Sequence, residues 1–228
     1  MTIYVLLAFY FALGAIGMWL FARNKDEERK RALWTKYVFY LIIVFTMMLF
    51  LELPPLLYRS LAVLLAVIGF YEIYHISSPY KRIFLFSASI YFILSCLFLY
   101  TYCQHTHLYL QYCYFVILTF DGFSQVTGQL LGGPKLVPAI SPNKTIAGVA
   151  GGSIAALLTC YFWQESYVLT TLLILSGLSG DLLASYLKRR VYVKDYSQLI
   201  PGHGGILDRF DSYIFALAIL GLIQLISC

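Results

Sequence analysis

The chain has 228 residues, of which 61% are hydrophobic and only 12% are charged, and its formal net charge is +5. A soluble domain of this length carries about twice that charged fraction, and it cannot hide so much apolar surface in one core. The composition therefore excludes an ordinary soluble protein and predicts an all-α, polytopic membrane protein.

About eight stretches can form transmembrane helices, because a hydrocarbon core about 30 Å thick requires roughly 20 apolar residues. Polar or glycine residues weaken two of them, 108–126 and 146–163. No basic region precedes the first stretch and no small-residue cleavage site follows it, so we expect a retained helix there. The eight predicted spans are 2–22, 34–51, 56–75, 83–101, 108–126, 146–163, 167–187 and 207–227.

The basic residues give these helices an orientation. If the N-terminus lies outside, 15 of the 16 Lys and Arg fall in or beside the four inside connections, and only Arg59 lies outside. The positive-inside rule then places both termini on the non-cytoplasmic side and the functional loops in the cytoplasm. The arm 23–36 is expected to be a solvated hairpin near anionic headgroups. The inside connections are 23–36, 76–82, 127–145 and 188–206.

Acidic residues within or at the ends of the spans indicate where chemistry can occur. Each costs about 2.5–3.5 kcal/mol at a helix centre, so such residues normally line a cavity or bind a cation. Glu72, near a helix end, is expected to pair with Lys or Arg or to lie at the wet interface. The other acidic residues have polar neighbours; they are Asp121, Asp181, Asp208 and Asp211.

The segment 180–189 places a carboxylate, a hydroxyl and an ammonium on one helical stripe. Asp181, Ser185 and Lys188 follow each other at i, i+4 and i+7. The carboxylate and the hydroxyl can hold a hard cation, and the ammonium can meet a phosphate.

The segment 201–211 combines a glycine-rich turn with two more carboxylates. Glycines around His203 allow the backbone to approach a ligand closely just before a helix begins. Asp208 and Asp211 then share a face at i, i+3. Carboxylates from two helices at the cytoplasmic end can share one or two Mg²⁺ ions, as two-metal sites for phosphoryl and nucleotidyl transfer do.

The segment 141–145 predicts a helix that begins at Ser141 and Pro142, with a cap followed by proline. Lys144 and Thr145 would then lie in the first turn, where free N–H groups attract anions. A plain helix cap explains the same residues. The glycines at 148, 151 and 152 are expected to allow close packing of helices.

Taken together, these segments resemble the CDP-diacylglycerol synthases, also called phosphatidate cytidylyltransferases. The resemblance extends over residues 115–215 and includes Asp121, Gly128, Gly132, Lys135 and Pro138 ahead of the segment 141–148. The long signature has no break across 27 residues. It runs Ser185-x-x-Lys188-Arg189-x₄-Lys194-Asp195 and continues through Pro201-x-His203-Gly204-Gly205-x-x-Asp208-Arg209-x-Asp211.

The resemblance implies a Mg²⁺-dependent transfer from CTP to phosphatidate in phospholipid biosynthesis, with K⁺ as a second candidate ion. It also implies a bacterial inner-membrane location, no nucleic-acid partner, and a homodimer as the candidate assembly. The expected metal ligands are Asp181, Asp208 and Asp211, which with Lys188 and Lys194 are the expected catalytic residues. Those expected to bind substrate are Lys144, Ser141, Thr145, Asp121, Ser185, Arg189, His203, Gly204, Gly205 and Arg209.

One domain is expected over residues 1–228, with helices of no recognised motif in 1–107 and the catalytic helices and cytoplasmic loops in 108–228. Two departures from the family pattern are alanines at 147 and 184, where the family usually has acidic residues. They leave ion and substrate preference open. The alternatives are a CDP-archaeol synthase or a CTP-dependent lipid or polyprenol kinase, and, from another class, a transporter or scaffold with a vestigial motif.

Overall fold

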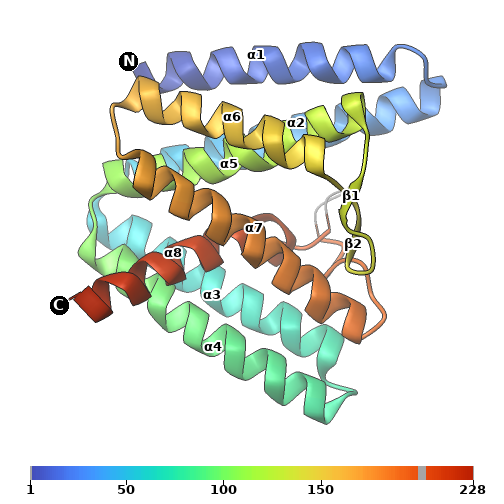
Figure 1. The fold of residues 1–228 in the computed structure, drawn as a ribbon. Coiled ribbons are helices and arrows are strands. Elements are labelled where there is room, and N and C mark those ends of the chain that lie inside the picture. Colours follow the sequence, from blue (N-terminus) through green and yellow to red (C-terminus); the bar gives the residue numbers. More distant parts are fainter. Residues whose placement is uncertain (1, 200–203, 228) are drawn as a thin grey trace.

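The computed structural model describes residues 2–199 and 204–227, and this part of the chain folds into one helical bundle with a small β-hairpin at one end (Figure 1). The predicted all-α class is confirmed. The elements are α1 (Thr2–Ala22), α2 (Glu27–Leu51), α3 (Pro55–Ser77), α4 (Lys81–Gln104), α5 (His107–Leu131), β1 (Lys135–Val137), β2 (Ser141–Thr145), α6 (Ile146–Trp163), α7 (Tyr167–Arg190) and α8 (Leu207–Ser227).

Eight helices are present in the described residues, and seven of them are long and apolar enough to cross a membrane. The exception is α5, whose length suffices but whose composition is more polar. Most of the first half of α5 is buried, and the helix contacts α1, α2, α6, α7 and α8. Protein rather than lipid therefore surrounds the first half of α5, and the chain is an integral membrane protein with this segment near its centre.

The connections between helices alternate between the two ends of the bundle. Figure 1 shows the β-hairpin and the connections α1–α2, α3–α4 and α7–α8 at one end, and both termini at the other. The prediction of a long arm over 23–36 is wrong, because α2 already begins at Glu27. Glu27 and Glu28 lie in its first turn, where negative charge is favoured by the helix dipole.

The loop before α6 corrects a second prediction. Residues Ser141–Thr145 form β2, which pairs antiparallel with β1 in the register Lys135↔Thr145 and Val137↔Ser141. The backbone N–H and C=O groups of this segment form hydrogen bonds with β1, so they are not free to begin a helix at Ser141. The helix instead begins at Ile146, and the N-cap is Thr145, whose hydroxyl accepts from the Gly148 N–H at 3.0 Å.

The predicted packing role of the glycines in α6 is confirmed. A Cβ on Gly148 would lie 2.6 Å from the Ser124 carbonyl oxygen of α5, which is closer than real side chains approach. The two helices therefore pack with their backbones in contact. This places the hairpin, including Lys144, against the end of α5.

Candidate active site

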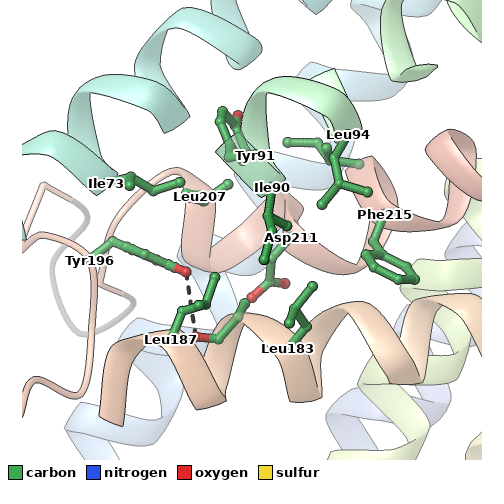
Figure 2. Close-up of a pocket in the computed structure, with 12 residues that line it drawn as sticks. Ile73, Ile90, Tyr91, Leu94, Leu183, Leu187, Tyr196, Leu207, Asp211 and Phe215 are labelled. Atoms are coloured by element: carbon green, nitrogen blue, oxygen red, sulfur yellow. Dashed lines mark hydrogen bonds between the residues drawn. The ribbon is translucent and has the colours of Figure 1, made fainter. Parts of the chain in front are cut away.

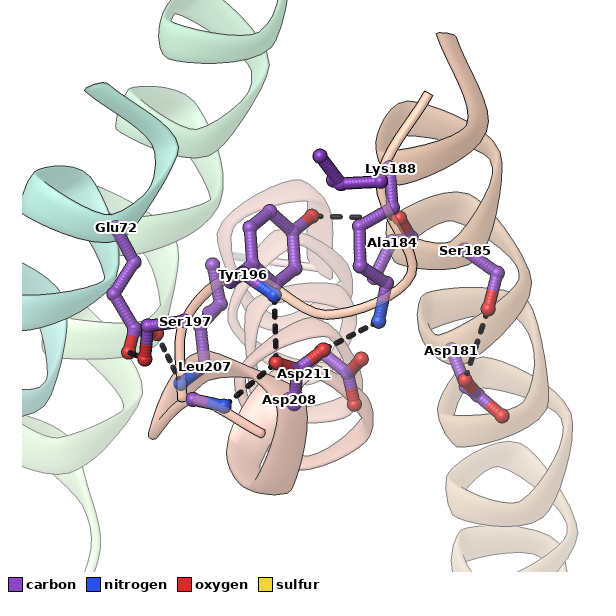
Figure 3. Close-up of polar contacts among 12 residues, drawn as sticks. Glu72, Asp181, Ala184, Ser185, Lys188, Tyr196, Ser197, Leu207, Asp208 and Asp211 are labelled. Carbon is purple, nitrogen blue, oxygen red and sulfur yellow. Dashed lines mark hydrogen bonds and ion pairs between the residues drawn. The ribbon is translucent and has the colours of Figure 1, made fainter. Parts of the chain in front are cut away.

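Asp208, the second residue of α8, is a carboxylate that accepts three hydrogen bonds at the hairpin end of the bundle (Figure 3). Its Oδ2 accepts from the backbone N–H groups of Tyr196 and Gly205, both at 2.8 Å, and its Oδ1 accepts from Lys188 Nζ at 2.6 Å. Only 3% of its side chain is exposed. Because a carboxylate has about four lone-pair positions, these three donors leave about one free.

Lys188 and Tyr196 form the buried wall beside this carboxylate. The Lys188 ammonium lies 5.0 Å from the centre of the Tyr196 ring, and the Tyr196 hydroxyl donates to the Ala184 carbonyl oxygen at 3.4 Å. Burial, followed by the charges of Asp211 and Asp208, raises the pKa of Tyr196 well above its usual value. The phenol is therefore neutral and serves as a hydrogen-bond donor.

Asp181 of α7 joins the hairpin to the helical bundle. It forms an ion pair with Lys144 of β2 and accepts from the Ser185 hydroxyl at 3.4 Å. Burial acts to lower the pKa of Lys144, but Asp181, Asp121 and Asp211 outweigh it and raise that pKa. The prediction that Asp181 and Ser185 share a stripe is confirmed, whereas Lys188, the third member, pairs with α8.

Carboxylates from three helices meet around these lysines. Asp211 of α8 interacts electrostatically with Asp181 of α7, with Asp121 of α5 and with Lys188. Asp121 also interacts with Lys144 and with Arg209. The residues drawn together from α5, α7, α8 and β2 are Asp121, Asp181, Asp211, Asp208, Lys144 and Lys188.

The chemistry of this cluster fits a hard cation. Carboxylate oxygens are the ligands that Mg²⁺ prefers, and the four carboxylates outnumber the two lysine ammonium groups. As they stand, no three His, Cys, Asp or Glu side chains in the described residues could hold a metal ion together. Lys144 and Lys188 form ion pairs with Asp181 and Asp208, so the lysines provide the positive charge in this arrangement.

The other predicted site residues lie around the cluster with different local roles. Arg189 is exposed and donates to the Val193 carbonyl oxygen at 2.8 Å, which closes the turn after α7. Lys194 and Arg209 are exposed. Gly204 has a φ of +83°, in the left-handed region, and His203 lies outside the described residues. Ser141 begins β2, away from any helix start.

Glu72 of α3 is the residue whose role the sequence did not predict. It is only 1% exposed and accepts three hydrogen bonds: from the Ser197 hydroxyl at 2.7 Å, and from the Ile206 and Leu207 N–H groups at 3.0 and 2.7 Å. The prediction of a Lys or Arg partner or a wet interface is wrong. An acidic residue within an apolar span does indicate a special role for Glu72. Nothing in the sequence, however, identifies the backbone N–H groups of Ile206 and Leu207 as its partners.

Two cavities adjoin the cluster. The larger has about 380 Å³ of empty space, a figure that includes space open to the outside. It lies between apolar side chains of α3, α4, α7 and α8 with the Asp211 carboxylate among them (Figure 2). The smaller, about 200 Å³, is lined by Lys144, Thr145 and Ser124. The Ser124 hydroxyl has no hydrogen-bond partner among the described residues. One cavity is thus apolar, whereas the other has polar groups.

Comparison with known proteins agrees with the sequence motifs. The family model described as the cytidylyltransferase family matches residues 1–226. A phosphatidate cytidylyltransferase of Bacillus subtilis (strain 168) is 43% identical over 127 residues, covering 51% of this chain and 47% of the relative. One from Staphylococcus aureus (strain COL) is 40% identical over 129 residues, covering 52% and 50%. The chain thus matches about half the length of these curated relatives.

Proposed function

This chain belongs to the cytidylyltransferase family, and we propose that it transfers a cytidylyl group from CTP to phosphatidate, forming CDP-diacylglycerol and pyrophosphate. The observation that carries the proposal is the two ion pairs Lys144–Asp181 and Lys188–Asp208 near an apolar cavity that Asp211 lines. The lysines and aspartates can bind the phosphates of a nucleoside triphosphate and its metal ion, and the apolar cavity can contact the acyl chains of a lipid.

The reaction joins two phosphates. A phosphate oxygen of phosphatidate forms a bond to the α-phosphorus of CTP, while the bond from that phosphorus to the bridging oxygen breaks and pyrophosphate leaves with the electron pair. Because the nucleophile is already anionic, no strong general base is required. Positioning and charge neutralisation supply most of the acceleration.

Lys144 and Lys188 would bind the phosphates. The Lys144 ion pair with Asp181 is about a quarter exposed, and Lys144 lines the adjoining cavity. Lys188 is more deeply buried, with 9% of its side chain exposed, and its ammonium is fixed by Asp208. Lys194, which is exposed in the α7–α8 connection, would neutralise a phosphate that extends toward the cytoplasm.

Mg²⁺ would be held by Asp181, Asp211 and Asp208, whose side chains would move closer together than they now stand. Asp208 would contribute the lone-pair position that its three donors leave free. When bound, the ion would neutralise charge on the phosphates of CTP. K⁺ is the second candidate ion for the same oxygen ligands. Ser185 holds one oxygen of Asp181 and so limits how that carboxylate turns.

The proposed location is the cytoplasmic face of a bacterial inner membrane. The hairpin end of the bundle carries most of the basic residues, and the positive-inside rule favours the cytoplasm for that end. CTP would then enter from the cytoplasm. Phosphatidate would arrive from the membrane with an acyl chain against the apolar cavity between α4 and α7 (Figure 2).

One experiment tests the activity. Purified protein would receive CTP labelled on its α-phosphorus, phosphatidate and Mg²⁺, and the lipid fraction would be examined for the label. We expect labelled CDP-diacylglycerol and released pyrophosphate. A CTP-dependent kinase would release CDP and place only the γ-phosphate on the lipid. Absence of both products, together with failure to bind CTP with Mg²⁺, would favour a transporter or scaffold.

A cavity-filling substitution tests the lipid side. Leu94→Trp places a larger ring in the apolar cavity, so we expect the KM for phosphatidate to rise about tenfold, with less change in the KM for CTP. Leu85→Trp is the control, because Leu85 lies on the same helix with 63% of its surface exposed. Equal KM values for phosphatidate in the two variants would argue against this cavity as the lipid site.

A further inference from the structure

Glu72 belongs to the half of the chain that has no recognised motif, yet it reaches the start of the helix that carries Asp208 and Asp211. Figure 3 shows its carboxylate on α3 facing Leu207 and Ser197, on the side of α8 away from α7. All three of its donors come from residues 197–207, more than 120 positions along the chain. Glu72 is only 1% exposed, so these protein groups and not bulk water supply its hydrogen bonds.

Physical chemistry explains why a carboxylate belongs there. The first N–H groups of a helix have no partner within the helix, and the partial positive charge at that end favours an anion. Glu72 accepts from two of them, those of Ile206 and Leu207, and Asp208 accepts from the Gly205 N–H. Two carboxylates thus divide three consecutive N–H groups between them.

We propose that Glu72 is a positioning residue for cytidylyl transfer, an inference that rests on the proposed function above. By binding the N–H groups of Ile206 and Leu207, Glu72 fixes the start of α8. The position of that start determines where Asp208 meets Lys188 and where α8 places Asp211, which lines the apolar cavity. Glu72 itself touches none of these three side chains through a hydrogen bond that the described residues show.

Gly205 supplies an independent way to disturb the same contact. A Cβ on Gly205 would lie 2.5 Å from Glu72 Oε1 and 2.7 Å from Oε2, so no larger residue fits without moving the carboxylate. Gly205 carries no positive φ that would add backbone strain. Gly205→Ala therefore tests the distance between Glu72 and the loop without changing the charge of Glu72.

Glu72→Gln keeps the shape of the side chain but replaces one acceptor oxygen with a donor NH₂ group, which then faces an N–H. We expect kcat to fall about 10- to 100-fold, as for other groups that orient the ligands of a reaction centre, with little change in the KM for CTP. Gly205→Ala should reduce kcat in the same direction. The double variant should lose less than the product of the two single losses, because both disturb one contact.

Controls separate positioning from folding. Rates would be measured on the monodisperse fraction of each purified variant and divided by its folded concentration. Gly14→Ala is the matched control for Gly205→Ala, since a Cβ on Gly14 would make only ordinary contact, 3.6 Å from the Tyr37 ring. Ser197→Ala removes one of the three donors to Glu72 and should reduce kcat less than Glu72→Gln does.

Wild-type kcat in the folded fraction of Glu72→Gln, or an additive double variant, would overturn the proposal. Hydrogen exchange gives a readout that does not need activity: the amides of residues 205–207 should exchange faster in Glu72→Gln than in the wild type. If the wild type makes no cytidine-bearing lipid, the proposed function fails, but exchange still decides whether Glu72 holds the start of α8. Unchanged exchange at these amides would reject the positioning role as well.

Discussion

Asp208→Asn is expected to reduce turnover about 10³-fold or more. The change removes a proposed magnesium ligand and also leaves the Lys188 ammonium buried without its partner. Breaking a buried pair from one side costs about 3–5 kcal/mol of stability, so the melting temperature should fall too. Turnover of CTP into CDP-diacylglycerol in detergent, with thermal unfolding of the same preparation, checks both effects.

A double variant separates the chemical loss from the structural one. Lys188→Met with Asp208→Asn removes both charges, so stability should recover relative to the single variant while turnover stays low. Asp26→Asn is the surface control, because Asp26 lies exposed in the α1–α2 connection and its pair with Arg29 is solvated. Near-normal turnover in a folded Asp208→Asn preparation would reject the role given to Asp208.

Asp181→Asn is expected to reduce turnover about 10³-fold, a loss of roughly 4 kcal/mol of transition-state stabilisation. The substitution removes a proposed ligand of Mg²⁺ and frees Lys144 from its ion pair, but the side chain is a quarter exposed, so the fold should be retained. Turnover measured against Mg²⁺ concentration should show a weaker dependence in the variant. In the wild type, a chelator should abolish turnover and added Mg²⁺ should restore it.

Glu165→Gln provides the comparison for Asp181→Asn. Glu165 is an exposed carboxylate in the α6–α7 connection, at the end of the bundle that carries the termini. Its removal should leave both turnover and the Mg²⁺ dependence unchanged. Full activity of the wild type in excess chelator, with other divalent ions also removed, would contradict the proposed metal requirement.

Local pattern was sufficient to predict the helices and part of the site. The apolar stretches predicted all eight helices, and the i, i+4 spacing placed Asp181 beside Ser185. The hairpin was missed because Ser141 and Pro142 are a common helix start, and strand pairing with Lys135–Val137 decides otherwise. Helix α2 begins at Glu27, seven residues before the predicted span 34–51. The charged residues that precede the apolar stretch are also helical.

Partners across the chain could not be predicted, because they depend on how the helices pack. Spacing within α7 places Lys188 on the same helical stripe as Asp181. The ion pair between Lys188 and Asp208 forms only because α7 packs against α8. In the same way, Lys144 reaches Asp181 because the hairpin folds back over α5. The prediction for His203 remains untested, since it lies outside the described residues.

The position of α5 has a consequence for biogenesis. Its neighbours α4 and α6 are apolar enough to cross a membrane, whereas α5 carries buried Gln111 and two buried tyrosines, Tyr112 and Tyr114. A segment with such polar groups enters a bilayer readily only when other helices supply its hydrogen-bond partners. Stable integration of α5 during synthesis is therefore expected to wait for α6 and α7. Truncation after α5 should leave a product that a cell degrades.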